Sequence, residues 1–142
     1  MKSRRDMMGD RPLPTIYPET EFYWNGAKEG KLLLNSCPSC DKAYFPPRPF
    51  CPVCGNRDVE IKQASGKGRL YSYIINHLPA PGYEPPFTVA VVMLDEGVKM
   101  VANLLDCPPD PEALILDMPL EVTFEQRGDV AIPQFKPAGG VA

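Results

Sequence analysis

Residues 37–54 read Cys37-Pro-Ser-Cys40-Asp-Lys-Ala-Tyr-Phe-Pro-Pro-Arg-Pro-Phe-Cys51-Pro-Val-Cys54, and this stretch organises the N-terminal half of the chain. It holds two C-x-x-C pairs separated by ten residues. Each pair forms a tight turn that brings two sulfur atoms together, and two such turns facing each other make a closed tetrahedral site of four thiolates. The spacing therefore predicts one structural zinc ion bound by Cys37, Cys40, Cys51 and Cys54. Gly55 suits the turn that follows the second pair.

Three other uses of these cysteines compete with zinc. Two disulfides would need an oxidising compartment, and a thioredoxin-like redox pair would need a βαβ pattern that we do not find in the sequence. A tetrahedral S₄ site also suits iron, so an iron centre stays open. The fifth cysteine, Cys107, stands in a loop-like Asp-Cys-Pro-Pro segment far in sequence from the single histidine, His77, and we interpret it as a bystander.

The N-terminal part of the chain is expected to hold an arm and one helix. Residues 1–18 are polar and rich in proline, which favours an extended arm. Residues 19–29 are predicted to form a short helix capped by Thr20 and ended by Gly30. Three adjacent aromatic residues in this helix are expected to pack on the metal-bearing unit, although a docking surface for another protein is an alternative.

A zinc ribbon is expected to follow the helix. Its predicted strands lead into and out of the two cysteine pairs at residues 31–36, 43–45 and 59–62. The segment Ala64-Ser-Gly-Lys-Gly68 is typical of a flexible junction. We therefore divide the chain into an arm (1–18), a helix with a rubredoxin-like zinc ribbon (19–65) and a second domain (66–142).

Residues 66–142 indicate a β domain. Residues 87–94 are apolar throughout, as in a strand covered on both faces. Residues 120–125 alternate apolar and polar side chains, which is typical of a half-buried strand, and Pro133 suggests an edge strand. Five strands with a longer connection between the third and fourth predict a Greek-key barrel of the OB type. They are expected at residues 69–76, 87–94, 99–105, 120–125 and 130–135.

Composition narrows the class of protein. The chain has 142 residues, 18 of them proline, which argues against a helical bundle. The longest apolar run is far shorter than the ~20 residues that span a bilayer, and we see no signal peptide, so we expect a soluble, cytoplasmic protein without membrane contact. Residues 66–142 carry five basic and ten acidic residues, which is unfavourable for binding nucleic acid.

The sequence resembles the DUF35 family. The resemblance covers about residues 15–137 and rests on the two cysteine pairs, Pro46-Pro-Arg48 between them, Gly66-x-Gly68-x-x-Tyr71-Ser-Tyr73, and Pro133-x-Phe135-x-Pro137. It implies a rubredoxin-like zinc ribbon joined to an OB-fold, with zinc on the four cysteines. It also implies a small non-catalytic subunit that binds acyl-CoA or bridges thiolase-superfamily enzymes, such as a thiolase or hydroxymethylglutaryl-CoA synthase, or related acyl-CoA enzymes.

Four functions are compatible with these features. An accessory or bridging subunit for acyl-CoA chemistry is favoured, because we find no catalytic motif in the sequence. Arg48, Lys67 and Arg69 are the candidate cations for CoA phosphates, and no other ligand-contacting residue is assigned. A nucleic-acid-binding zinc-ribbon/OB-fold protein is the main alternative. An electron carrier with iron and a free-standing enzyme are weaker ones.

Overall fold

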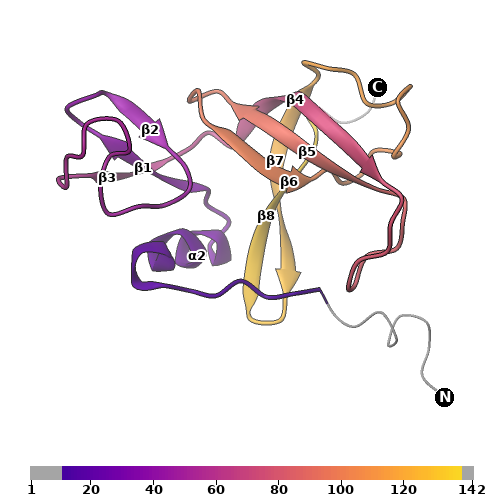
Figure 1. Ribbon diagram of the computed structural model, residues 1–142, viewed down its shortest axis with the longest axis horizontal. Helices are drawn as coiled ribbons and strands as arrows, with labels where there is room; N and C mark the ends of the chain where they lie inside the picture. Colours follow the sequence, from indigo (N-terminus) through magenta and orange to yellow (C-terminus); the bar gives the residue numbers. More distant parts are fainter. Residues whose placement is uncertain (1–10, 139–142) are drawn as a thin grey trace.

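The computed structural model describes residues 11–138 as two small sheets and one helix (Figure 1). The first sheet has the strand order β2-β1-β3, and the second has the order β6-β5-β4-β7-β8. The protein is mainly β, as predicted, with one short helix near its N-terminus. The regular elements are η1 (Pro18–Thr20), α2 (Glu21–Lys28), β1 (Leu33–Cys37), β2 (Lys42–Tyr44), β3 (Glu60–Gln63), β4 (Lys67–Asn76), β5 (Phe87–Leu94), β6 (Lys99–Asn103), β7 (Pro119–Arg127) and β8 (Val130–Pro137).

Helix α2 lies where a helix was expected, but its cap differs. Thr20 occupies the N-cap position without a side-chain hydrogen bond to the helix. Its Oγ1 instead accepts from the backbone N–H of Tyr17 at 3.0 Å and donates to the Tyr17 carbonyl at 3.1 Å. The expectation of a Thr20 side-chain cap was therefore wrong, because the preceding 3₁₀ turn uses that hydroxyl. Gly30, with φ of 76°, follows the end of the helix as predicted.

The aromatic residues of α2 pack on the core. Tyr23 is buried, and its ring meets Trp24 edge-on at 4.8 Å between centroids and Phe45 of the ribbon at 5.5 Å. Phe22 and Trp24 are partly buried against the same core. Helix α2 also lies against β8 of the larger sheet, so it contacts both sheets (Figure 1).

One continuous apolar core joins the two sheets. It contains Leu32 and Leu34 from the ribbon side together with Leu70, Leu120 and Phe135 from the larger sheet. All five side chains are at most 2% exposed. The two sheets are therefore packed together, and the division of the chain at residues 65 and 66 stays a prediction. The part of the arm before Arg11 lies outside the described residues.

The larger sheet is an OB-fold that is not closed into a barrel. Strands β6 and β8 stand at opposite ends of the strand order, and they are joined by a single parallel bridge between Leu104 and Phe135. The backbone N–H of Leu105 donates to the Phe135 carbonyl at 2.7 Å beside it. A closed barrel needs a continuous ladder between these strands. The expected five strands are present, but the expected closure is limited to this one point.

Strand β5 also differs from its prediction. Its residues alternate between half-buried and buried along the whole length. Thr88, Ala90, Val92 and Leu94 face the core, whereas the alternate residues lie on the outer face. Only one face of the strand is therefore fully buried. The apolar residues on its other face are half-buried. Strand β8 lies at the edge of the sheet, as Pro133 suggested.

Candidate functional site

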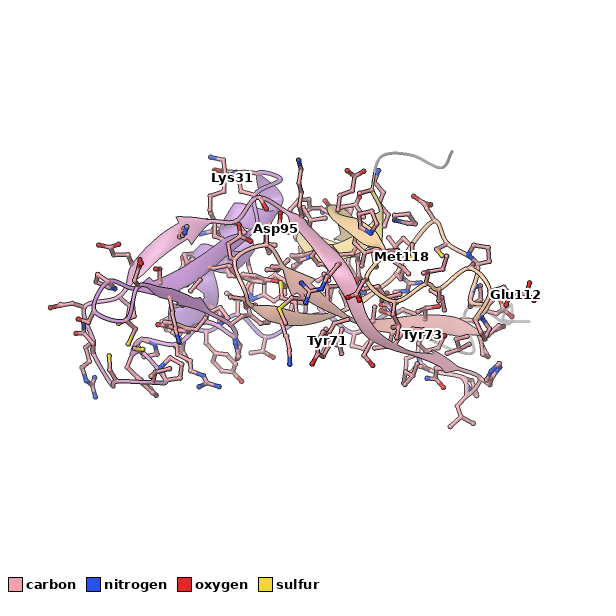
Figure 2. All side chains as sticks on the ribbon, turned by 90° about the horizontal axis from the view of Figure 1, so that it is seen from above. Lys31, Tyr71, Tyr73, Asp95, Glu112 and Met118 are labelled. Atoms are coloured by element: carbon pink, nitrogen blue, oxygen red, sulfur yellow. The ribbon has the colours of Figure 1, made fainter. Side chains whose placement is uncertain are left out.

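The four cysteines of the two C-x-x-C pairs converge at one end of the ribbon. Their sulfur atoms all lie within 4.8 Å of one another. Cys37 ends β1, and its Sγ lies 3.6 Å from that of Cys54, whereas Cys40 and Cys51 are 3.8 Å apart. Figure 2 shows sulfur atoms, in yellow, gathered at the end of the ribbon opposite the larger sheet. All five cysteines of the chain are free of disulfides.

The second turn is built around Cys51. Its backbone carbonyl accepts from the N–H of Gly55 at 2.9 Å, and Gly55 has φ of 77°. The N–H of Val53 points at the Cys51 sulfur at 3.4 Å. Hydrogen bonds from the backbone N–H groups of Cys54 and then Val53 lower the pKa of the Cys51 thiol to about 6. The turn therefore favours a thiolate at this position.

The same cluster resists holding several thiolates without a cation. The pKa of Cys40 is raised to about 12, first by its hydrogen bond with Cys54 and then by burial, with the charge of Cys37 adding to the effect. A bound divalent metal removes that repulsion because it attracts every thiolate. Four sulfur donors with this mutual spacing fit one structural zinc ion and leave no open position for a substrate.

Cys107 and His77 lie outside this group. Cys107 is half-buried between β6 and β7, its Sγ donates to the Ala113 carbonyl at 3.7 Å, and burial raises the pKa of its thiol. His77 is exposed just after β4. The Cys107 thiol is thus engaged by a backbone carbonyl, and its raised pKa disfavours a thiolate, which agrees with its interpretation as a bystander.

A second polar group was not expected from the sequence. Glu125 on β7 forms ion pairs with Arg11 of the arm at 2.9 Å and with Arg127 at 3.1 Å. Its Oε1 also accepts from Gln134 Nε2 at 3.0 Å. Burial alone would raise the pKa of Glu125, but the hydrogen bonds from Gln134 and Arg11 and the Arg11 charge outweigh it and lower that pKa. The arm is thereby fixed to the β7–β8 hairpin.

Tyr83 links this group to the loop between β4 and β5. Its hydroxyl accepts from Arg127 Nη2 at 2.9 Å, and the Arg11 guanidinium lies 3.9 Å above its ring. The Tyr83 ring also stacks on Phe87, with 4.9 Å between centroids. Of these contacts, the sequence showed only that Tyr83 lies in a proline-rich loop. The contacts themselves could not be predicted, because the partners of Tyr83 come from distant segments.

Two clefts border the Tyr83–Phe87 stack. One has a volume of about 340 Å³ and runs between β6 and β8, where the ladder is open. The other, of about 230 Å³, lies between the Tyr83 loop and the segment after β6. Arg48, Lys67 and Arg69 line neither cleft. Arg69 instead pairs with Asp117 at 3.0 Å, so the three cations considered for CoA do not converge on either hollow.

Comparison with known proteins agrees with the fold and the cysteine site. Residues 24–60 match a family model described as the rubredoxin-like zinc ribbon domain of ChsH2, and residues 62–125 match its C-terminal OB-fold domain. The chain is therefore a zinc-ribbon protein with an attached OB-fold. It belongs to the DUF35 family.

Three relatives and one solved structure illustrate the match. A DUF35 domain-containing scaffold protein of Methanocaldococcus jannaschii is 32% identical over 107 residues, which is 72% of this chain and 74% of that protein. A probable enoyl-CoA hydratase alpha subunit of Thermomonospora curvata is 37% identical over 130 residues, or 90% of this chain. The benzoylsuccinyl-CoA thiolase subunit BbsA of Thauera aromatica is 29% identical over 72 residues, covering 51% of this chain and 50% of that protein.

The solved structure is an Ltp2-ChsH2(DUF35) aldolase. It superimposes with a TM-score of 0.79 at 34% identity, covering 89% of this chain and 99% of that chain. The match to the Thermomonospora relative, by contrast, spans only 40% of that relative's length, so this chain corresponds to less than half of it. Among the described residues, no helix is long and apolar enough to cross a membrane.

Proposed function

We propose that this protein is a non-catalytic accessory subunit that binds an acyl-CoA-processing enzyme and acts as a bridging subunit in its complex. The observation that carries the proposal is the match over nearly the whole of the DUF35 chain in an aldolase complex. Names of other relatives point to the same chemistry, because they include a hydratase subunit and a thiolase subunit. The partner proposed here is a thiolase-superfamily enzyme or a related hydratase or aldolase, in the cytoplasm, with acyl-CoA as the shared ligand.

The zinc site has a structural role in this proposal. Cys37, Cys40, Cys51 and Cys54 bind one zinc ion, which holds the ribbon in a fixed shape beside the OB-fold. The zinc supplies folding energy and no reaction step, because its coordination is closed. We assign partner binding to the combined surface of the ribbon (19–65) and the OB-fold (66–142).

Nucleic-acid binding is the alternative that the experiment must separate. OB-type binders stack bases on exposed aromatic side chains of the central strands. Here Phe87 of β5 already stacks on Tyr83. Val89 and Val101 are the aliphatic neighbours that line the same cleft. The stacking face of Phe87 is therefore already occupied by Tyr83, which is unfavourable for stacking a base there.

The experiment is an affinity purification of the tagged full chain from its native extract, with and without nuclease. A stoichiometric acyl-CoA enzyme, identified by mass spectrometry and retained after nuclease treatment, is the expected result. Cys37→Ser with Cys40→Ser should release that partner, whereas Cys107→Ser should retain it. Recovery of nucleic acid alone, or of no acyl-CoA enzyme, would overturn the proposal.

A further inference from the structure

The loop between β6 and β7, drawn in orange in Figure 1, holds two large aliphatic side chains in water. Ile115 is 63% exposed, and Leu116, its neighbour in the chain, is 57% exposed. We call these two residues the exposed pair. Single exposed apolar side chains are normal on a protein surface, whereas apolar side chains that lie together and are bordered by polar residues mark interaction sites. The exposed pair is therefore a candidate contact for another molecule.

Hydrogen bonds fix the loop on both sides of the exposed pair. Before it, the backbone N–H of Leu114 donates to the Asp110 carbonyl at 3.0 Å, and the Leu114 side chain is buried in the core. After it, the backbone N–H of Asp117 donates to the carbonyl of Leu70 on β4 at 2.7 Å. The turn is thus tied to the core at one end and to β4 at the other. A loop that is already ordered loses little conformational entropy when a partner binds it.

The same region of the chain carries unbalanced negative charge. Residues 104–126 contain six acidic residues and no lysine or arginine. Three of the six are paired with lysine or arginine from other segments. Asp110 and Glu112 are exposed, and neither forms an ion pair within residues 11–138. The exposed pair is therefore accompanied in its loop by two carboxylates whose charge is not neutralised.

These charges select the kind of partner. The carboxylates repel the phosphates of nucleic acid and the anionic surface of a membrane. They also repel the same loop of a second copy of the chain. A protein surface that offers an apolar pocket with lysine or arginine at its border complements both features, because it buries the aliphatic side chains and pairs the acidic ones.

We propose that residues 110–117 dock into an apolar pocket with a basic border on the acyl-CoA-processing enzyme. Ile115 and Leu116 fill the pocket, and Asp110 and Glu112 pair with the lysine or arginine residues around it. The identity of the partner rests on the proposed function, whereas the place of the contact rests on the exposure, hydrogen bonds and charge of this loop. The loop is one part of the surface assigned to partner binding.

The test uses the full chain and the acyl-CoA enzyme that mass spectrometry identifies in the affinity purification. Ile115→Ser with Leu116→Ser should weaken binding of that enzyme at least about tenfold, as loss of a central apolar contact does. Ile74→Ser with Leu78→Ser is the matched control, at positions that are 61% and 72% exposed on β4 and just after it. All four side chains are exposed, so both variants should fold normally, and the control should keep its affinity. Equal affinities of the two double variants would overturn the proposal.

A reversal of charge tests the basic border of the pocket. Glu112→Lys should weaken the complex about threefold to tenfold and make its affinity less sensitive to NaCl between about 0.05 and 0.5 M. Asp95→Lys makes the same change in the exposed turn between β5 and β6, and Figure 2 shows Asp95 well apart from Glu112. This control should keep the affinity and the salt dependence of the unmodified protein. The same loss in both variants would trace the effect to net charge and would contradict the contact.

Hydrogen exchange of the purified complex shows directly where the enzyme binds. Exchange in residues 110–117 should be slower in the complex than in the free chain, and unchanged exchange there would overturn the proposal. Sedimentation of the chain alone should show a monomer. A dimer that is lost in Ile115→Ser with Leu116→Ser would assign the exposed pair to a second copy instead.

The outcomes separate this inference from the accessory role. An acyl-CoA enzyme that binds the unmodified chain and the variant of the exposed pair equally well rejects the loop contact and keeps the accessory role. Recovery of no acyl-CoA enzyme with the unmodified chain rejects the accessory role and, with it, this partner.

Discussion

Arg11 Nη1 lies 2.9 Å from Glu125 Oε1, and this ion pair joins the N-terminal arm to strand β7. The Glu125 side chain is 16% exposed, so the pair is partly shielded from water. Arg127 strengthens the attachment because its Nη1 donates to the Pro12 carbonyl at 2.8 Å. The arm, the Tyr83 loop and the β7–β8 hairpin are thus held by one connected set of contacts.

Replacing Glu125 by Gln should lower the free energy of unfolding at neutral pH by about 1–3 kcal/mol, because it removes charged hydrogen bonds to two arginines. Glu121→Gln on the same strand is the matched control. Its partner Lys136 is 3.7 Å away and its side chain is 40% exposed, so the change should be below about 1 kcal/mol. Urea unfolding of both variants measures the difference, and equal losses would contradict the role of Glu125.

The same carboxylate predicts a pH dependence. The folded pKa of Glu125 lies below its unfolded value, so its stabilising contribution is present above the unfolded pKa of about 4.3 and is lost as the pH falls through the folded value. The unmodified protein should therefore lose more stability than Glu125→Gln on acidification from about pH 6 to pH 3. Urea midpoints at these pH values test this. Parallel curves for the two proteins would show that Glu125 makes no such contribution.

Gly82→Ala should detach the arm from the Tyr83 loop. Gly82 has φ of 77°, and an added Cβ would lie 2.5 Å from the backbone nitrogen of Arg11. Gly97→Ala is the control because Gly97 has a similar φ of 82° but open space around its Cβ position. Both variants carry about 1–3 kcal/mol of backbone strain, but only Gly82→Ala should speed hydrogen exchange in residues 11–13. Equal exchange in the two would refute the contact.

Zinc removal should unfold the ribbon. The unmodified protein is expected to bind one zinc per chain and to be colourless, whereas Cys37→Ser with Cys40→Ser should bind none. The larger sheet should stay folded with a lower melting temperature, because Leu34 and Phe135 share one core. Elemental analysis and circular dichroism measure these outcomes, with Cys107→Ser as the control. A red, iron-containing protein would contradict the zinc assignment.

Tyr23→Ala should destabilise the protein by about 3–5 kcal/mol, as a large-to-small change in a packed core does. Tyr23 is 5% exposed between Trp24 and Phe45. Tyr17→Ala removes the same side chain at a position that is 55% exposed, and it should cost well under 1 kcal/mol, about the usual range for a surface change. Fluorescence of Trp24, the single tryptophan, follows unfolding directly. Similar losses in the two variants would place Tyr23 outside the core.

Local patterns in the sequence were enough to predict most elements. Strand β5 was predicted with the bounds that the structure gives it, Phe87–Leu94. The cysteine spacing likewise predicted the metal group, because each turn is formed by residues adjacent in the chain. Patterns of this kind failed at the Thr20 cap, where a neighbouring 3₁₀ turn competes for the same hydroxyl.

The zinc ribbon and the five strands of the OB-fold follow from spacing and alternation along the chain, and the family follows from the resemblance of its motifs. Three features come from tertiary packing alone: the opening of the sheet between β6 and β8, the ion pair of Arg11 with Glu125, and the hydrogen bond from Arg127 to the Tyr83 hydroxyl. These features join residues far apart in the chain. Their geometry depends on how the sheets, the arm and the loops pack, which no local pattern specifies.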